Sequence, residues 1–288
     1  MEEIISKAAT LLEALPYIQR FRSQIFVVKY GGSFMDSPDP EERHRVARDV
    51  VFLEAVGINP VVVHGGGKAI TRALDEAGVK SQFVHGYRVT DAATAEVVDR
   101  VLSREINPEI VSAIHEFGGK AHGFAGPEIF RCRKYLIPGE DVDLGFVGEL
   151  TEVNVELLRE CIRRSVTPVI SPTAQGDDGK IYNCNADIAA AKTAIALKAR
   201  RLVFMSDVPG LLRDPKEDAS LIRHLSVSEV PELQKKGVIA KGMIPKVDSA
   251  AGAIESGVEK VQFVDGRIPH SVLLEIFTDA GVGTEVVL

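Results

Sequence analysis

Two glycine clusters near the start of the sequence have the composition of anion-binding loops. Lys29-Tyr30-Gly31-Gly32-Ser33 comes directly after the apolar run Ile25 to Val28, and His64-Gly65-Gly66-Gly67 comes directly after Val61 to Val63. Glycine lets the backbone approach a ligand and point its N–H groups at negative charge, and Lys29 adds a positive charge to the first cluster. The glycines alone leave two interpretations open, an anion site and a pair of purely structural turns.

Neither cluster matches the common nucleotide-binding motifs. A Walker A loop would need Gly in place of Val62 and Ser or Thr in place of Ala69. The dinucleotide pattern begun at Gly65 reaches Ile70 where its last Gly belongs. The H-R-D and D-F-G motifs of protein kinases are absent. An anion site here would therefore be of another type.

Two later stretches add polar groups suited to a small anionic ligand. Arg88 lies in H-G-Y-R-V-T-D, and an arginine there can bind a carboxylate through two parallel hydrogen bonds. The alternative is an ordinary solvated surface arginine. Asp187 ends the polar run Y-N-C-N-A-D before an Ala-rich helix. Taken alone, Asp187 is better interpreted as the N-cap of that helix.

The C-terminal third of the chain supplies two further candidates. The run M-S-D-V-P-G-L, residues 205–211, follows an apolar strand and is typical of a loop at the edge of a ligand site. Lys246 begins a helix in G-M-I-P-K-V. A cation is unfavourable at the positive end of a helix dipole. This position is a modest reason to assign Lys246 to an anionic ligand.

Alternating apolar strands and helices must position these residues. Strands are expected at 25–28, 61–63, 166–170, 202–205 and 261–264, and helices at 41–56, 69–77, 155–164, 188–197 and 247–256. This alternation predicts an α/β fold, a three-layer sandwich with a mainly parallel central sheet. Ligands of such sheets bind at the carboxyl ends of strands, where the glycine clusters lie.

The N-terminal segment predicts an amphipathic helix. Its apolar stripe consists of Ile4, Ile5, Ala8, Leu11, Leu12 and Leu15, and Pro16 is expected to interrupt the helix. The stripe must be buried against something. Packing on its own domain and packing on another subunit remain equally open.

Composition excludes several classes of protein. The net charge of -7 and the pI near 5.6 argue against nucleic-acid binding. No apolar run approaches the roughly 18 residues of a membrane span, and the start lacks a secretory signal. We therefore expect a cytoplasmic protein without a membrane partner. The 3 cysteines include no C-x-x-C, and no H-E-x-x-H occurs, so no residue is assigned to a metal.

The motifs V-V-K-Y-G-G-S, V-V-H-G-G-G, H-G-Y-R-V-T-D, Y-N-C-N-A-D, S-D-V-P-G-L and G-M-I-P-K-V, in this order, resemble the amino-acid kinase family over nearly the whole chain. Within it they are most similar to the members that phosphorylate N-acetyl-L-glutamate. The N-terminal helix and the C-terminal run 266–284 resemble the hexameric branch that L-arginine inhibits. The chain departs from the family pattern at Lys68, Pro127, Glu128 and Lys241.

The resemblance implies a role for each matched residue. Lys29 and Lys246 would stabilise the transferring phosphoryl group, and Asp187 would hold the two lysines. Arg88 and Asn183 would bind acetylglutamate, and Gly32, Gly66 and Gly67 would present N–H groups to phosphate and substrate. The remaining matches are a nucleotide-binding set, Ser206, Asp207, Val208, Pro209, Gly210 and Leu211, and an arginine-binding set, His270, Glu275, Gly281 and Gly283.

The resemblance also implies a domain organisation and partners. A helical arm at 1–22 would precede an amino-acid lobe at 23–195 and a nucleotide lobe at 196–288. ATP with Mg²⁺ carried on its phosphates would be the phosphoryl donor in arginine biosynthesis. The expected assembly is a homo-hexamer, a trimer of dimers, with a PII-type signalling protein as a candidate partner.

Three alternatives remain. Another family member, an aspartate, glutamate or carbamate kinase, would share most motifs. A non-catalytic arginine sensor would not need Lys29, Lys246 and Asp187. A nicotinamide-dependent oxidoreductase is disfavoured by the failed dinucleotide pattern.

Overall fold

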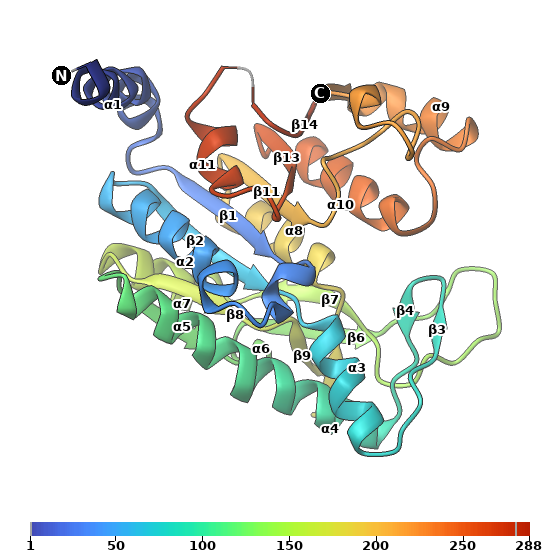
Figure 1. Ribbon diagram of the computed structural model, residues 1–288. Helices are drawn as coiled ribbons and strands as arrows, with labels where there is room; N and C mark the ends of the chain where they lie inside the picture. Colours follow the sequence, from blue (N-terminus) through green and yellow to red (C-terminus); the bar gives the residue numbers. More distant parts are fainter. Residues whose placement is uncertain (1, 280) are drawn as a thin grey trace.

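In the computed structural model, which describes residues 2–279 and 281–288, one large twisted sheet runs through the molecule with helices on both faces (Figure 1). Its eight strands lie in the order β12-β14-β13-β11-β1-β2-β8-β5. The predicted α/β fold with a mainly parallel central sheet is confirmed.

The core of this sheet is parallel. The strands are β1 (Ile25–Tyr30), β2 (Asn59–His64), β5 (Ala121–Phe124), β8 (Thr167–Ile170), β11 (Arg201–Ser206), β12 (His224–Ser226), β13 (Lys260–Asp265) and β14 (Thr284–Val287). Only the β13–β14 pairing is antiparallel among the described strands of this sheet.

Alternate residues of the central strands pack into two separate hydrophobic cores. Val27 of β1 packs in one core, and the adjacent Val28 packs in the other. Both side chains are fully buried, as expected of a strand covered on two faces. This explains why β1 and β2 appear in the sequence as continuous apolar runs.

Each core belongs to one layer of helices. The first contains α7 (Val155–Arg163), α8 (Ala186–Leu197), α9 (Val230–Lys235) and α10 (Ile244–Glu255). The second contains α2 (Pro40–Ala55), α5 (Asn107–Glu116), α11 (Ser271–Ile276) and the end of α1 (Glu2–Phe21). α3 (Gly67–Glu76), α4 (Ala92–Asp99) and the π-helical turn η2 (Arg100–Ile106) share a third, smaller cluster.

A second sheet, which the sequence pattern did not predict, lies against the first core. Its strands are β6 (Phe130–Lys134), β7 (Gly148–Val153), β9 (Thr173–Gly176) and β10 (Ile181–Asn183), in the order β10-β9-β6-β7. A separate hairpin pairs β3 (Phe83–Val84) with β4 (Tyr87–Arg88). These strands are short and rich in polar residues, such as Phe-Arg-Cys-Arg-Lys in β6, so they lack a continuous apolar run.

The prediction that Pro16 interrupts the N-terminal helix is wrong, because α1 continues through it to Phe21. Proline removes one backbone donor and crowds the carbonyl four residues earlier. Pro16 and Leu12 are both exposed, so that carbonyl can turn to water instead.

The two halves of α1 have different environments (Figure 1). Tyr17 and Ile18 pack on the second core, and Phe21 is fully buried there. Leu11 and Leu12 are 69% and 67% exposed. The side chains of Ile4 and Ile5 lie outside the described part. Among the side chains of the arm that the structure describes, those that pack on its own domain belong to its second half.

The carboxyl ends of three neighbouring strands meet at one edge of the sheet. Tyr30 at the end of β1 is in register with His64 at the end of β2, and Lys29 is in register with Phe204 of β11. Both glycine clusters and the 207–211 segment therefore begin at the same edge.

A search of the described residues for a helix that could span a membrane found none with the required length and apolar character.

Candidate active site

A carboxylate shared by two lysines forms the centre of the site. The Lys29 Nζ lies 3.1 Å from the Asp187 Oδ1, and the Lys246 Nζ lies 2.6 Å from the Asp187 Oδ2. The Lys29 and Asp187 side chains are each 10% exposed. The three residues come from the end of β1, the first turn of α8 and the first turn of α10.

Asn185, rather than Asp187, caps α8. The Asn185 side chain accepts hydrogen bonds from the backbone N–H of Asp187 at 2.8 Å and of Ile188 at 3.2 Å. The interpretation of Asp187 as the N-cap is therefore wrong. Because Asn185 satisfies the helix end, the Asp187 carboxylate is free to reach both lysines.

The electrostatics of this trio favour an anionic ligand. Burial raises the pKa of Asp187, but the charges of Lys29 and Lys246 outweigh it and lower the pKa from 3.8 to about 2. Burial lowers the pKa of Lys29, an effect that the Asp187 charge opposes and the Lys246 charge reinforces. Two cations around one anion leave a net positive charge at a buried position, which a bound anion would compensate.

A cavity of about 350 Å³ lies over this trio. Its lining brings together predicted residues from distant parts of the sequence: Lys29, Gly32, Gly66, Gly67, Arg88, Asn183, Asp187 and Asp207. Lys246 contacts Asp187, which is one of the lining residues.

The glycines of the cavity wall have steric reasons to be glycine. A Cβ on Gly31 would collide with the ammonium group of Lys29 and would lie 2.8 Å from its Cε. A Cβ on Gly66 would lie 2.5 Å from Ile106 and 2.7 Å from Leu102 in the π-helical turn. Gly32 has a φ of 146°, which few other residues adopt.

Arg88 is buried in the cavity wall and bound only by neutral groups. Its guanidinium donates to the Gly67 carbonyl at 3.0 Å, to the Thr71 Oγ1 at 2.9 Å, and to the Ser81 hydroxyl. It also stacks over Phe83, 4.7 Å from the ring centre. Among the described residues no carboxylate lies within ion-pair distance of it. A buried guanidinium without a counter-charge is suited to a carboxylate ligand.

The predicted nucleotide-binding residues follow β11 next to the glycine loop. The Asp207 Oδ1 accepts hydrogen bonds from the Ser33 backbone N–H at 2.6 Å and from the Ser33 hydroxyl at 2.8 Å. Val208 is exposed and Leu211 is buried. Ser206, Pro209 and Gly210 lie in the same stretch. Asn183 donates to the Thr90 hydroxyl at 3.3 Å.

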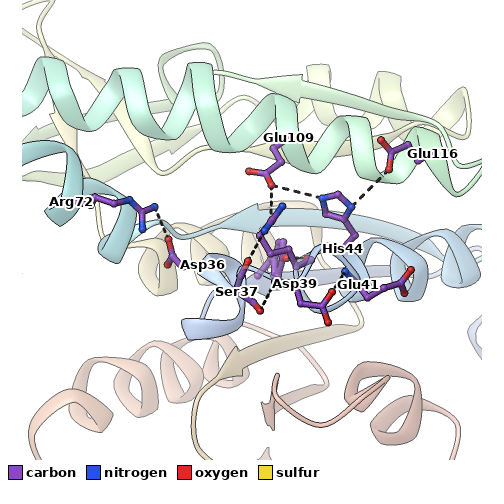
Figure 2. A network of polar contacts seen from close by, with 10 residues as sticks. Asp36, Ser37, Asp39, Glu41, His44, Arg72, Glu109 and Glu116 are labelled. Atoms are coloured by element: carbon purple, nitrogen blue, oxygen red, sulfur yellow. Dashed lines mark hydrogen bonds and ion pairs between the residues drawn. The ribbon is translucent and has the colours of Figure 1, made fainter. Parts of the chain in front are cut away.

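Ion pairs and a hydrogen bond hold the segment that follows the glycine loop (Figure 2). Arg72 of α3 lies 3.1 Å from Asp36 in the short helical turn η1 (Ser33–Asp36). Arg43 of α2 lies 3.2 Å from Glu109 of α5 and donates to the Ser37 carbonyl at 2.5 Å. Residues 33–37 are thereby held against α3 and α2, and α2 is joined in turn to α5.

The residues predicted to bind arginine lie elsewhere, near the C-terminus. The Glu275 carboxylate accepts hydrogen bonds from the backbone N–H groups of Val282 and Gly283 at 2.7 and 3.0 Å, and from Gln262 at 2.9 Å. Gly281 lies beside the same carboxylate. His270 is turned toward α2, where its Nδ1 lies 2.6 Å from the Asp49 carboxylate.

Sequence reasoning missed Gly31, Ser33 and Asn185. Gly31 and Ser33 lay inside the first glycine motif, so their neighbourhood was available as a signal. Asn185 precedes α8 as an N-cap residue does, and its competition with Asp187 for that position could have been weighed.

The chain is similar to proteins of known family. A family model described as "Amino acid kinase family" matches residues 24–265. The chain is 48% identical to the acetylglutamate kinase of Carboxydothermus hydrogenoformans, with 99% of each chain covered. It is 47% identical to the acetylglutamate kinase of Aquifex aeolicus, with 100% of each covered.

Solved structures share the fold. The N-acetylglutamate synthase from Neisseria gonorrhoeae complexed with coenzyme A and N-acetyl-glutamate gives a TM-score of 0.86 at 24% identity, covering 98% of this chain and 63% of that chain. The same synthase complexed with coenzyme A and L-arginine gives 0.81 at 25%, covering 97% and 65%. The chain thus spans less than two thirds of the synthase.

The Asp187 trio predicts a specific acid dependence of stability. The folded-state pKa of about 2 lies below the ordinary 3.8, so Asp187 contributes stability that is present above about pH 4 and is lost as the pH falls toward 2. Asp187→Asn should remove this dependence and leave Lys29 buried without a counter-charge. We expect it to lower the free energy of unfolding at neutral pH by about 3–5 kcal/mol.

Urea unfolding at about pH 7 and about pH 3 measures both effects. The control Glu232→Gln removes an exposed pair with Lys236 and should change little. An Asp187→Asn protein that loses stability between the two pH values as steeply as the wild type would contradict the prediction.

Proposed function

The chain belongs to the amino acid kinase family, as an enzyme that transfers phosphoryl groups, and we propose that its acceptor is the side-chain carboxylate of N-acetyl-L-glutamate. The products are N-acetyl-γ-glutamyl phosphate and ADP, in arginine biosynthesis. The observation that carries this proposal is the Lys29–Asp187–Lys246 trio under a cavity that also contains the uncompensated Arg88.

The acceptor needs no general base. A glutamate-type carboxylate has a pKa near ~4.3 and is already ionised at neutral pH. With a pKa of about 2, Asp187 stays ionised as well and acts as a fixed charge rather than a proton acceptor. The task left to the protein is to bring two anions together, by positioning and charge stabilisation.

Lys29 and Lys246 supply the charge stabilisation, and each contacts a different oxygen of Asp187. Each ammonium group neutralises charge on the phosphoryl oxygens as they shift between donor and acceptor. Asp187 keeps the two cations within one carboxylate's reach despite their mutual repulsion. The backbone N–H groups of Gly32, Gly66 and Gly67 add donors that need no reorganisation.

ATP, as its Mg²⁺ complex, supplies the phosphoryl group when bound. The residues fit such a group, because the Lys29–Asp187–Lys246 trio carries net positive charge. The glycine loop is also joined to the 206–211 segment through Ser33 and Asp207. Ser206, Asp207, Val208, Pro209, Gly210 and Leu211 would hold the nucleotide. In this proposal the nucleotide binds in the lobe of residues 196–288 and the amino acid in the lobe of residues 23–195.

Arg88 and Asn183 would bind the non-reacting end of acetylglutamate. Arg88 offers a buried guanidinium whose present partners are all neutral. A substrate carboxylate that replaced these neutral partners could accept two parallel hydrogen bonds from Arg88. The cavity of about 350 Å³ suits an amino-acid derivative.

The alternatives receive less support. The relatives at 47–48% identity are acetylglutamate kinases, which disfavours an aspartate, glutamate or carbamate kinase. An arginine sensor without activity would have no use for an intact trio. The cavity also lacks the dinucleotide motif of an oxidoreductase.

A substrate panel tests the proposal. With ATP and Mg²⁺, hydroxylamine should trap acyl phosphate far faster from N-acetyl-L-glutamate than from L-glutamate, L-aspartate or carbamate. Equal or better trapping with a free amino acid would assign the chain to a sister activity. Absence of trapping with any acceptor would reject the kinase.

Gly31 offers a steric test of the catalytic lysine. In Gly31→Ala the new Cβ meets the Lys29 ammonium, and displacing one preorganised donor should lower kcat by about 10- to 100-fold. The control Gly252→Ala lies in α10 with nothing within 4 Å of the added Cβ, and it should keep full activity. Steady-state kinetics decide, and a Gly31→Ala enzyme with wild-type kcat would contradict the assigned position of Lys29.

We further propose that L-arginine inhibits the enzyme and that α1 joins subunits into a hexamer. Leu11 and Leu12 expose apolar surface on a helix whose second half is already anchored by Tyr17 and Phe21. A two-fold pairing of like helices would bury that surface. Tyr17 also donates a hydrogen bond to Asp279, so the arm touches the segment next to the proposed arginine residues.

His270, Glu275, Gly281 and Gly283 would form the arginine site. Glu275 supplies the negative charge for the guanidinium or ammonium group, although its oxygens are engaged within the chain. The related synthase was solved with L-arginine, which supports a basic amino acid as a ligand of this fold. Arginine would act by binding one arrangement of the lobes more tightly.

Deleting residues 1–15 tests the arm. The truncated enzyme should be smaller by light scattering and insensitive to arginine while it retains catalysis. Leu11→Gln with Leu12→Gln should do the same without shortening the chain, and Glu13→Gln serves as a surface control. A truncated enzyme of unchanged size and unchanged arginine sensitivity would contradict the proposal.

A further inference from the structure

Lys68 is the one charged residue of the cavity lining whose side chain the protein leaves unengaged, among the described residues. The other charged lining residues are Lys29, Arg88, Asp36, Asp187 and Asp207. Each has partners: Lys29 and Asp187 in the trio, Asp36 with Arg72, Asp207 with Ser33, and Arg88 with three neutral groups. Lys68 is exposed, and its ammonium has no hydrogen bond or ion pair within the described chain.

The helix that carries Lys68 gains nothing from it. Lys68 lies in the first turn of α3, directly after the helix start at Gly67, and that turn contains no acidic residue. The positive end of the helix dipole disfavours a cation there. Arg72, four residues on, adds a like charge on the same face. The helix end favours an anion at this place, so the helix itself supplies no reason for a cation there.

The same helical turn anchors Arg88. The Arg88 guanidinium donates to the Gly67 carbonyl and to the Thr71 hydroxyl, residues on either side of Lys68 in the chain. Lys68 therefore belongs to the helical turn that holds Arg88, and both residues line the cavity. The nucleotide segment follows β11, on the other side of β1 from the β2–α3 connection that carries Lys68.

Charge balance in the cavity supports the same role. The lining carries three cations, Lys29, Lys68 and Arg88, against three anions, Asp36, Asp187 and Asp207. Lys246 contacts Asp187 and adds a fourth cation. Without Lys68 the site would hold as many anions as cations, in a chain whose total charge is -7. An acceptor with two carboxylates would then enter a site without surplus positive charge.

We propose that Lys68 is a specificity-determining residue that pairs with the non-reacting α-carboxylate of the acceptor, beside Arg88. This inference rests on the proposed kinase function. Its contact is made with a carboxylate that does not react, so it strengthens the ground state and the transition state alike. It favours dianionic acceptors over acceptors whose α-carboxylate is neutralised.

Kinetics of Lys68→Gln test the inference. The KM for N-acetyl-L-glutamate should rise about three- to tenfold, with kcat within about twofold and the KM for ATP unchanged. Lys68→Arg should restore the wild-type KM, and Lys68→Glu should raise it further. The control Lys120→Gln makes the same charge change directly before β5, at the amino edge of the sheet away from the cavity, and should leave all constants unchanged.

A second acceptor identifies the group that Lys68 recognises. Wild type should prefer N-acetyl-L-glutamate over its α-carboxamide, and Lys68→Gln should reduce that preference by the same three- to tenfold. The salt dependence of the KM should weaken in Lys68→Gln between about 0.01 M and about 1 M ionic strength, where the Debye length falls from about 30 Å to about 3 Å.

The outcomes distinguish a failure of this inference from a failure of the proposed kinase function on which it rests. A wild-type enzyme that uses neither acceptor rejects the kinase proposal. An active wild type with an unchanged KM in Lys68→Gln rejects the role of Lys68 alone. A fall in kcat at constant KM, or an equal loss with both acceptors, likewise overturns the pairing with the α-carboxylate.

Discussion

The Asp187 carboxylate, held between two ammonium groups, is the interaction on which the rest of the site depends. Two lysine ammonium groups that both contact one buried carboxylate would repel each other strongly if that carboxylate were absent. One carboxylate, with each oxygen on a different lysine, makes their proximity tolerable and leaves a surplus of positive charge. Three elements of the fold bring these side chains together. β1 brings Lys29, the capped start of α8 brings Asp187, and α10 brings Lys246 from late in the chain.

The elements with both faces buried could be predicted from sequence. β1, β2 and β11 contain continuous apolar runs because each packs into two cores. The second sheet could not be predicted this way, because strands such as β6 alternate buried and exposed residues over a short length. The region of α4 and η2 was missed as well, since a π-helical turn blurs the helical period. Pro16 misled because an exposed helix can tolerate a proline that a buried one cannot.

The site itself followed from topology more than from any single motif. Carboxyl ends of neighbouring parallel strands must meet, so the glycine clusters and the 206–211 segment were expected at one edge, where they lie. Contacts that depend on side-chain direction were out of reach. The need for Gly31 arises from the path of the Lys29 side chain over its own loop. The turn of His270 toward Asp49 depends on how α2 packs against the C-terminal segment.

The alternation of Val27 and Val28 between two cores has a consequence for how such a chain can change over evolution. Inserting or deleting one residue in β1 would exchange the two faces of the strand. The same slip would put apolar side chains in the wrong layer and turn Lys29 away from Asp187. Stability and chemistry would then fail together, so no partly active intermediate would be left for selection to improve. Residues 138–141, between β6 and β7, are exposed and belong to neither core. Length variation should accumulate in that stretch, while the central strand keeps its length.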